Sequence, residues 1–275
     1  MTSLESVERW AAAEGDGFSW ELFHENSKLS RNERHLTFAR HPSDATVVSV
    51  MRRLRRVKPY DDCPKITLPS DLPATRDSFD DVLASRVSAR SFGEGEIGLA
   101  ELAKVLLAPT AVTRTNEDAA YSNPFRAAPS GGALYPLELY VHARRVTDLA
   151  PGLYHLDPED RELDVLRTGD QSGDISGLFI QPDLEATAAA TVLVTGVFYR
   201  STFKYGDRGY RFVLLEAGHL VQSFCLAATA IDLASTPVGG YHDRGVDRWL
   251  GFDGLSQSTI YAMFLGRGLE PGSGT

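Results

Sequence analysis

Apolar residues recur along the chain with two different periods, and each period predicts a kind of element. A helical spacing predicts a short helix over 77–86, a second over 97–108 and a long one over 209–234. The long helix is apolar nearly all round, so we expect it to be buried. Alternating or continuous apolar runs predict strands over 137–143, 188–198 and 258–266, and a hairpin over 152–166 that turns at 157–160.

The order of these elements indicates the fold class. Helices and strands mix without the regular β–α–β alternation of a parallel sheet, which favours an α+β fold with one mixed or antiparallel sheet flanked by helices. The polar first 75 residues end in two prolines, at 69 and 73, and are expected to form an arm. Residues 76–268 are then the main domain, and residues 269–275 are expected to be a disordered tail.

The charge balance argues against a nucleic acid as ligand. The chain carries 28 basic and 37 acidic residues, a net charge of −9, so binding to DNA or RNA would gain little from counterion release. One run, at 51–59, is basic. Such a run is typical of a solvated helix face, and a docking surface for an acidic peptide is the alternative.

The cysteines and the apolar runs indicate whether the protein binds a metal, which compartment it occupies and whether it spans a membrane. Cys63 and Cys225 have no Cys-x-x-Cys or Cys/His spacing, which gives no indication of a metal site and fits a reducing compartment. No uninterrupted apolar run of membrane-spanning length and no signal-peptide pattern is present. We therefore expect a cytoplasmic protein that is not a membrane protein.

Common nucleotide and hydrolase motifs are missing. The sequence has no Gly-x-Gly-x-x-Gly after a strand and no Gly-x4-Gly-Lys-Ser/Thr, so dinucleotide and P-loop sites of those types are not expected. It also lacks His-Glu-x-x-His and the Gly-x-Ser-x-Gly elbow of hydrolases.

Three polar residues at steps of two suggest a phosphate site. Arg86, Ser88 and Arg90 would share one side of an extended segment, where two guanidinium groups and a hydroxyl suit a phosphate. The alternative is a solvated loop.

A second candidate is the stretch 126–143, in which prolines bracket a Gly-Gly pair just before a strand. Gly131 and Gly132 would let a flat ligand approach the main chain, and Ser130 could bind a ring heteroatom. The alternative is an ordinary turn. Another Gly-Gly pair, Gly239 and Gly240, follows the long helix and could also point backbone N–H groups at a ligand.

A third candidate is the pair Lys204 and Tyr205, two residue types that can transfer protons once their surroundings shift them from a pKa near 10. The alternative is a surface lysine beside a packed tyrosine. Glu216 and His219 lie one turn apart in the long helix, and we expect structural hydrogen bonds rather than catalysis for them.

In this order, the motifs resemble the FMN-dependent nitroreductase superfamily. They are Arg-x-Ser-x-Arg-x-Phe, then PSGGALYP, GLYHL, KYGDRGYRFVLLEAGHLVQ, PVGG and LGR, and together they cover residues 76–268. Within the superfamily, GALYP together with Lys204 and Tyr205 resembles the SagB-type dehydrogenases, which oxidise azoline rings in peptides. The segments FHENSKL and KITLP are similar to the leading arm of that branch, which makes residues 1–75 a candidate region for peptide docking.

The resemblance implies a cofactor, a set of residues that bind it and an assembly. The fold would be nitroreductase-like, in an intertwined homodimer with FMN at its interface, so the long helix would be core or interface. The phosphate would be held by Arg86, Ser88, Arg90 and Arg267, the isoalloxazine lined by Pro129, Ser130, Gly131 and Gly132, and the flavin N5 edge approached by Gly239 and Gly240.

The resemblance also implies a reaction. A thiazoline or oxazoline would become an azole by losing a proton to Lys204 or Tyr205 and a hydride to flavin N5, with dioxygen as the expected final oxidant. The substrate would be peptide or carrier-bound, and a cyclodehydratase would be a partner. Two alternatives stay open, an NAD(P)H-dependent reductase of nitro compounds or quinones and a non-catalytic flavin-bearing scaffold subunit.

Overall fold

A seven-stranded sheet forms the centre of the protein in the computed structural model, which describes residues 19–28, 45–55, 60–75, 78–116 and 123–269. The strand order is β1-β8-β7-β5-β9-β11-β10, and every neighbouring pair is antiparallel. The strands are β1 (Lys65–Thr67), β5 (Leu137–Ala143), β7 (Gly152–Asp157), β8 (Glu162–Thr168), β9 (Ala190–Val197), β10 (Leu233–Val238) and β11 (Gln257–Arg267).

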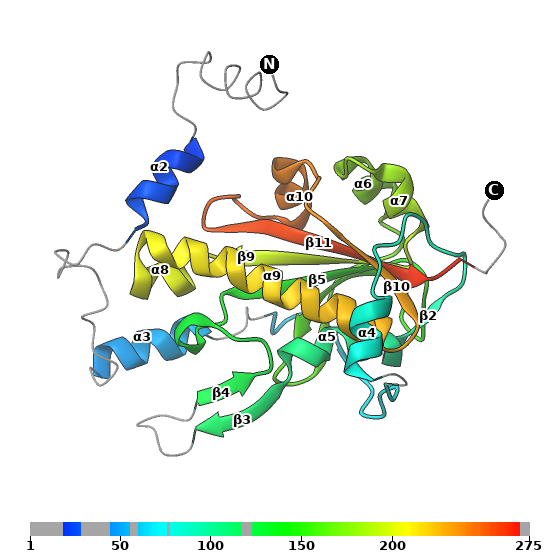
Figure 1. Ribbon diagram of the computed structural model, residues 1–275, viewed down its shortest axis with the longest axis horizontal. Coiled ribbons are helices and arrows are strands. Elements are labelled where there is room, and N and C mark those ends of the chain that lie inside the picture. The colour runs from blue at the N-terminus through cyan, green and yellow to red at the C-terminus, as the bar shows by residue number, and fades with distance from the viewer. Residues whose placement is uncertain (1–18, 29–44, 56–59, 76–77, 117–122, 270–275) are drawn as a thin grey trace, which may run out of the picture.

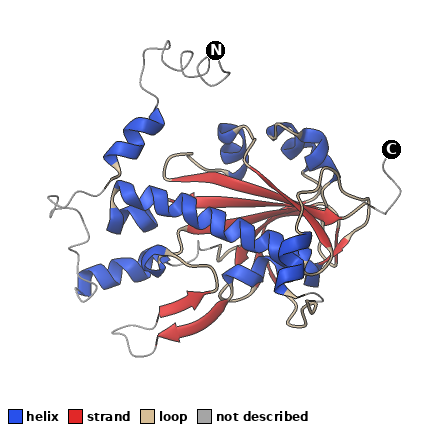
Figure 2. Ribbon diagram, viewed as in Figure 1, coloured by secondary structure: helices blue, strands red, loops and turns tan. Residues whose placement is uncertain are grey.

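Helices cover both faces of this sheet (Figures 1 and 2). One face is covered by α4 (Phe79–Ser85), α5 (Leu99–Thr110), α8 (Tyr199–Tyr205) and the long α9 (Asp207–Thr229), which contacts the other three. The short helices α6 (Ser172–Ile175), α7 (Pro182–Thr187) and α10 (Asp243–Leu250) pack on the other face. Two small ribbons complete the fold, the parallel pair β2 (Ile97–Gly98) with β6 (Val146–Thr147) and the hairpin β3 (Val112–Asn116) with β4 (Asn123–Arg126).

The alternation of side chains along the central strands divides the core between the two faces. In β5, Leu139 and Val141 pack with α5 and α9, whereas Tyr140 belongs to the cluster under α6, α7 and α10. In β9, Val192 and Leu193 divide in the same way. A sheet buried on both faces explains why the run at 188–198 is continuously apolar.

The predicted elements agree with the structure in kind, and in two of the helices some predicted residues belong instead to a neighbouring strand. The predicted strand at 258–266 is β11, and the predicted hairpin at 152–166 is β7 and β8. The predicted helix at 97–108 begins only at Leu99, because Ile97 and Gly98 form β2. The predicted helix at 209–234 ends at Thr229, and its last residues begin β10.

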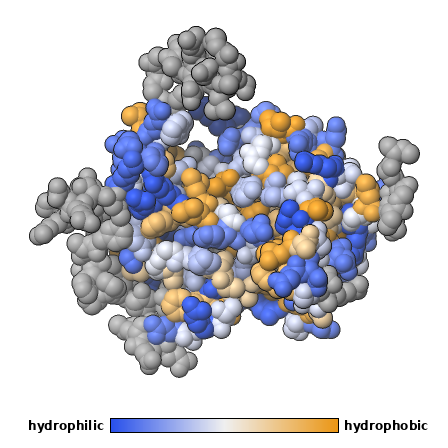
Figure 3. Space-filling view, in the orientation of Figure 1, coloured by the Kyte–Doolittle hydropathy of each residue, from blue (hydrophilic) through white to orange (hydrophobic). Residues whose placement is uncertain are grey.

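The expectation that the long helix is buried all round is wrong. One face of α9 packs on the sheet through Val213, Ala217 and Val221, while Leu214 and Leu215 on the other face are 39% and 59% exposed. Hydrophobic side chains come to the surface in this region of the molecule (Figure 3). In the described part of the chain, α9 is also long and apolar enough to cross a membrane, and its packing in the core accounts for that composition.

Parts of the N-terminal 75 residues contact the main domain. The strand β1 pairs with β8 at the edge of the sheet, and Met51 of α3 (Ala45–Arg55) packs against Leu134, Phe203 and Tyr205. The helix α2 (Ser19–Asn26) reaches the start of α9, where Arg211 donates a hydrogen bond to the carbonyl of His24 at 2.5 Å. In the basic run, Arg52 and Arg53 are exposed, and residues 56–59 lie outside the described part. The proposed disordered tail, apart from Leu269, also lies outside it.

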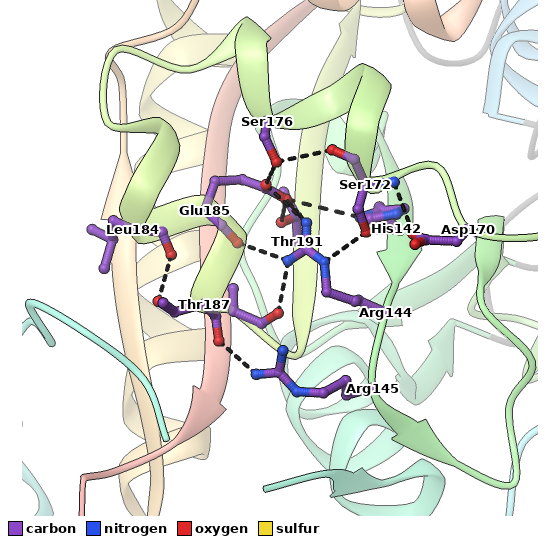
Figure 4. Close-up of polar contacts among 11 residues, drawn as sticks. His142, Arg144, Arg145, Asp170, Ser172, Ser176, Leu184, Glu185, Thr187 and Thr191 are labelled. Atoms are coloured by element: carbon purple, nitrogen blue, oxygen red, sulfur yellow. Dashed lines mark hydrogen bonds and ion pairs between the residues drawn. The ribbon is translucent and has the colours of Figure 1, made fainter. Parts of the chain in front are cut away.

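A buried ion pair fastens α6 and α7 to the sheet (Figure 4). Arg144, just after β5, binds the fully buried Glu185 of α7 at 2.9 Å and donates to the Ala188 carbonyl at the same distance. Ser176 and Thr191 donate hydrogen bonds to the same carboxylate at 2.6 and 3.0 Å. Arg144, Ser176 and Thr191 all bind the Glu185 carboxylate, so this set of contacts holds α6 and α7 against the sheet.

Candidate functional site

The Gly-Gly pair that precedes β5 forms a tight corner. Gly131–Ala133 is a single 3-10 turn, in which Gly132 has φ +67°, Ala133 +51° and Tyr135, shortly after it, +46°. The left-handed region costs little only for glycine, so of these three positions Gly132 adopts its conformation at the least cost. We call the loop 129–135 the glycine corner. This stretch is a turn, as one interpretation expected. A turn that exposes the backbone of Gly132 also agrees with the other interpretation, a surface for a flat ligand.

The predicted catalytic pair lies directly against this corner. A side chain added at Gly132 would place its Cβ 2.5 Å from the Tyr205 hydroxyl and 3.0 Å from the Lys204 ammonium nitrogen. Both residues end α8, and Gly206, with φ +54° and ψ −142°, makes the break before α9. That conformation is essentially confined to glycine. Lys204 also lies 5.2 Å from the centre of the Tyr205 ring.

The buried carboxylate of Glu216 accepts hydrogen bonds from the glycine corner. The Gly131 N–H donates to Glu216 Oε1 of α9 at 2.8 Å, and the Ser130 hydroxyl hydrogen-bonds the same carboxylate. Burial raises the pKa of Glu216 to about 7, and these two hydrogen bonds act against the shift. Ser130 Oγ also accepts from the Tyr135 N–H at 2.9 Å, so this hydroxyl is used inside its own loop.

An arginine joins α8 to the corner and to the sheet. Arg200, which is 6% exposed, places Nη2 2.5 Å from Glu138 Oε1 in β5 and donates from Nη1 to the Tyr135 carbonyl at 3.3 Å. Glu138 continues the chain of contacts to His155 at 2.9 Å. One side chain therefore fixes the helix of Lys204 and Tyr205 to the loop they face.

The predicted phosphate residues lie elsewhere on the chain. Arg86 follows α4, Ser88 forms a bridge with Ser235 of β10, and the Arg86 guanidinium lies 3.5 Å from Ser88 Oγ. Arg90 is on the same extended segment and exposed. Among the described residues, no carboxylate forms an ion pair with Arg86 or Arg90, so both cations remain available to an anion. We call Arg86, Ser88 and Arg90 the anchor cluster.

The second Gly-Gly pair directly follows β10 (Leu233–Val238), the strand that borders the anchor cluster. Gly239 and Gly240 are exposed just beyond β10, roughly 13 Å along the strand direction from Ser235. The Gly240 carbonyl accepts from the Ile180 N–H at 3.0 Å. The anchor cluster and Gly239–Gly240 thus share one edge of the sheet, since β10 is its last strand.

Arg267 at the end of β11 is already paired. Its two terminal nitrogens contact the Glu101 carboxylate at 2.8 and 2.7 Å, and its Nε donates to the Glu96 carbonyl at 2.9 Å. A phosphate would have to compete with that bidentate pair, so a role for Arg267 in phosphate binding stays a prediction.

The glycine corner lies against the N-terminal half of α9, and the anchor cluster lies near its C-terminal end. Glu216 supports the corner, while the charge of Arg86 acts on the Cys225 thiol, roughly 14 Å further along the helix. A hollow beside Gly132 is lined by residues 125–130 and by Arg114, Ala133 and Tyr135, and no residue of the anchor cluster borders it. Among the described residues of one chain, the hollow at the glycine corner and the anchor cluster have no lining residue in common.

Two residues of the site were not recognised as functional candidates in the sequence. Arg200 stands one helical turn before Lys204, and that spacing was the available signal. Glu216 was expected to be structural, and it does hydrogen-bond the corner, yet it also borders a cavity beside Pro129 and Tyr135. His219, considered together with Glu216, is exposed rather than buried.

Three known proteins resemble the sequence. MJ1384 of Methanocaldococcus jannaschii, described as a nitroreductase, is 30% identical over 192 residues, which are 70% of this chain and 92% of that protein. The microcin B17-processing protein McbC of Escherichia coli is 28% identical over 51% of this chain and 54% of its own length. The trifolitoxin-processing protein TfxB of Rhizobium leguminosarum bv. trifolii is 26% identical over 74% of this chain and 57% of its own. The match thus spans little more than half of McbC and TfxB.

Solved structures share the fold at lower identity. A structure from Anabaena variabilis, described as a nitroreductase, has a TM-score of 0.68 and 23% identity over 90% of this chain and 47% of that one. The E. coli microcin synthetase McbBCD complex with truncated pro-MccB17 has a chain with a TM-score of 0.57 and 20% identity over 91% and 92%. A nitroreductase structure from Exiguobacterium sibiricum, in complex with FMN, has a TM-score of 0.50 and 14% identity over 74% and 93%.

The family assignment rests on the greater part of the chain. The model of the nitroreductase family matches residues 83–267, a range that contains Arg86, the glycine corner, Lys204 and Arg267. The antiparallel sheet with helices on both faces agrees with the solved relatives. With the sequence match, the fold and the related MJ1384 in agreement, this chain belongs to the nitroreductase family.

Proposed function

We propose that this protein is an FMN-dependent dehydrogenase that oxidises azoline rings to azoles in a peptide. One observation carries the proposal, namely the contact of Lys204 and Tyr205 with the bare backbone of Gly132. A proton acceptor and a surface suited to a flat ring system lie side by side there. Oxidation of a ring carbon needs both, because a proton and a hydride must leave the substrate.

The residues present fit the cofactor. The anchor cluster offers two guanidinium groups without a carboxylate partner in the described part of the chain, which suits a phosphate. A Cβ at Gly132 would collide with the Tyr205 hydroxyl. The corner therefore has no side chain at this position, and a flat ring can lie close to its backbone. The chemistry that FMN supplies when bound is acceptance of a hydride at N5.

The protein's own groups account for the proton. When an azoline becomes an azole, one hydrogen leaves as a proton and the other with the electron pair. The Lys204 amine or the Tyr205 oxygen would take the proton, and Arg200 keeps their helix fixed to the corner through Glu138 and Tyr135. The role of the protein is therefore positioning together with general base catalysis.

The separation of the two half-sites supports a homodimer. Phe79 and Leu83 of α4 and Val87 just after it are 68%, 47% and 71% exposed, and Leu214 and Leu215 extend this apolar surface along α9. A two-fold axis that crosses α9 would pair the N-terminal half of one helix with the C-terminal half of the other. The glycine corner of one copy would then lie beside the anchor cluster and Gly239–Gly240 of its partner.

Two relatives favour a peptide as substrate. McbC and TfxB are both named for the processing of a peptide product, and the McbBCD structure holds a precursor peptide. By analogy, a cyclodehydratase that forms the azoline would supply this protein with its substrate. Residues 1–75, whose α3 packs on α8, are the candidate region for peptide docking.

Substitution of Lys204 tests the function. The FMN-loaded protein is expected to remove two hydrogen atoms per ring from an azoline-containing peptide, followed by mass spectrometry. Lys204→Ala should lower turnover about 100-fold or more while the bound flavin absorbance is retained, because a general base contributes that much. Lys104→Ala, a lysine change on α5, should keep wild-type turnover.

Two other results would replace the proposal. MJ1384, described as a nitroreductase, gives weight to NAD(P)H-dependent reduction of nitro compounds. That function is favoured if the wild type never dehydrogenates azolines and Lys204→Ala reduces a nitroarene as fast as wild type. Normal output of a reconstituted pathway from a Lys204→Ala/Tyr205→Ala protein would instead favour a non-catalytic subunit.

A further inference from the structure

A hollow of about 410 Å³ opens between the β3–β4 hairpin and the glycine corner. The hairpin extends away from the sheet below α9 (Figure 1). Arg114 and Phe125 of the hairpin, Arg126 at its end, and Ser130 and Gly132 of the corner all line the hollow. Its volume is within the range of sites that hold small ligands or a short stretch of peptide.

The hollow is basic in an acidic protein. The chain carries a net charge of −9, yet two arginines border this surface and Lys204 lies just behind Gly132. The guanidinium of Arg114 lies 5.0 Å from the Phe125 ring centre, and that of Arg126 lies 4.7 Å from the Tyr135 ring centre. Stacking on an aromatic face orients a guanidinium and leaves its N–H edges free to donate.

The hydrogen-bonding capacity of these arginines is largely unused within the described residues. The Arg126 side chain is only 10% exposed, and its Nε has no hydrogen-bond partner there. Its ion pair with Glu159 is 3.4 Å long, and Glu159 is 45% exposed, so this contact contributes little. Arg114 forms no ion pair with any carboxylate of the described part of the chain. A buried donor without a partner is costly, which favours an anionic occupant.

We infer that the hollow binds a carboxylate of the peptide substrate next to the ring that reacts, with Arg114 and Arg126 as the groups that recognise it. The inference rests on the proposed function for the identity of the bound peptide. A guanidinium fork matches a carboxylate in two parallel hydrogen bonds, so an Asp or Glu side chain or a C-terminal carboxylate would fit. The hollow ends at Gly132, where Lys204 and Tyr205 lie.

A binding measurement that needs no turnover tests the site. Two short peptides without azolines, both with amidated C-termini and identical except for Asp-Asp in one and Asn-Asn in the other, are titrated into the FMN-loaded protein by calorimetry. We expect the Asp peptide to bind about tenfold more tightly or better. Arg114→Gln and Arg126→Gln should each reduce that preference, and the double variant should abolish it. The control Arg244→Gln/Arg248→Gln removes two charges from α10 and should leave the preference unchanged.

Several outcomes would overturn the inference. Equal binding of the two peptides, or a preference that survives the double substitution, would show that the arginines do not read a carboxylate. Loss of bound flavin from the double variant would assign them to the cofactor instead. If Arg126→Gln does not fold, Arg114→Gln alone decides, because Arg114 is exposed. A confirmed preference without any azoline turnover would retain the site and refute the proposed function.

Discussion

Glu216 gives a residue-scale prediction about pH. Burial raises the pKa of Glu216 to about 7 from an ordinary value near 4.5. Its protonated form is therefore favoured by the fold, and the resulting stability is complete below pH 4.5 and is lost as the pH rises through 7. Glu216→Gln keeps an acceptor for the Gly131 N–H and cannot ionise. Between pH 4.5 and 8, wild type should lose about 3 kcal/mol of unfolding free energy relative to this variant.

Urea denaturation of the two proteins at pH 4.5, 6 and 8 measures this difference. Glu94→Gln, which changes an exposed carboxylate, is the matched control and should follow wild type at every pH. If the unfolding free energies of wild type and Glu216→Gln change in parallel with pH, the raised pKa of Glu216 is contradicted.

At the residue scale, the sequence allowed site residues to be named where a local motif contains them, and their roles remain predictions. The structure adds that Lys204 lies beside Gly132, although their motifs are far apart in sequence. Arg200 has no motif of its own, because its role depends on Glu138 and Tyr135, which only the folded chain brings within reach. The pairing of Arg267 with Glu101 was missed for the same reason.

At the scale of elements, Arg200 is expected to set the position of α8. Arg200→Lys keeps one positive charge but loses the planar fork whose two nitrogens reach Glu138 and the Tyr135 carbonyl separately, so we expect Lys204 and Tyr205 to lose their fixed distance from Gly132. We expect kcat for azoline oxidation to fall about 10- to 100-fold, since small displacements have effects of that order. Stopped-flow kinetics and thermal melting on the same sample separate this effect from unfolding.

Retention of wild-type kcat in Arg200→Lys would show that the two contacts of Arg200, with Glu138 and with the Tyr135 carbonyl, are not needed for catalysis. A fall in kcat that only follows the loss of folded protein would assign Arg200 to stability alone. The control Arg145→Lys changes an arginine whose side chain, within the described residues, donates to the carbonyls of Thr187 and Gly93, and it should keep kcat.

The ion pair that fastens α6 and α7 should matter for stability. Arg144→Leu would leave the fully buried Glu185 carboxylate without its cation, which typically costs about 3–5 kcal/mol. The neighbouring change Arg145→Leu removes hydrogen bonds to two carbonyls and leaves no buried charge, so a smaller loss is expected. Urea denaturation compares them, and equal losses would show that the charge of Glu185 is not the deciding factor.

The kinds of elements followed from periodicity, while their ends did not. The helix predicted over 209–234 runs into β10, because Leu233 is apolar enough to continue a helical pattern and pairs with Arg267 only in the sheet. The same pattern suggested a helix buried all round, because apolarity does not distinguish a core face from a surface that meets a partner. Only the structure shows that Leu214 and Leu215 lie on the exposed face of α9.

At the scale of the whole molecule, we propose that each active site combines the glycine corner and Lys204 of one copy with the anchor cluster of the other. In the described part of one chain, the glycine corner lies against the N-terminal half of α9 and the anchor cluster near its C-terminal end, and no residue of the cluster borders the hollow beside the corner, so we expect that a single copy does not complete the site. A mixed dimer of two defective chains tests this claim directly.

The measurement is azoline turnover by a dimer of Arg86→Gln/Arg90→Gln and Lys204→Ala chains, isolated by two different affinity tags. One of its two sites would hold both defects and the other neither, so the account predicts about half the activity of wild type, while each defective homodimer has almost none. If both halves came from the same chain, every site would hold a defect. A mixed dimer as inactive as its parents would contradict the account.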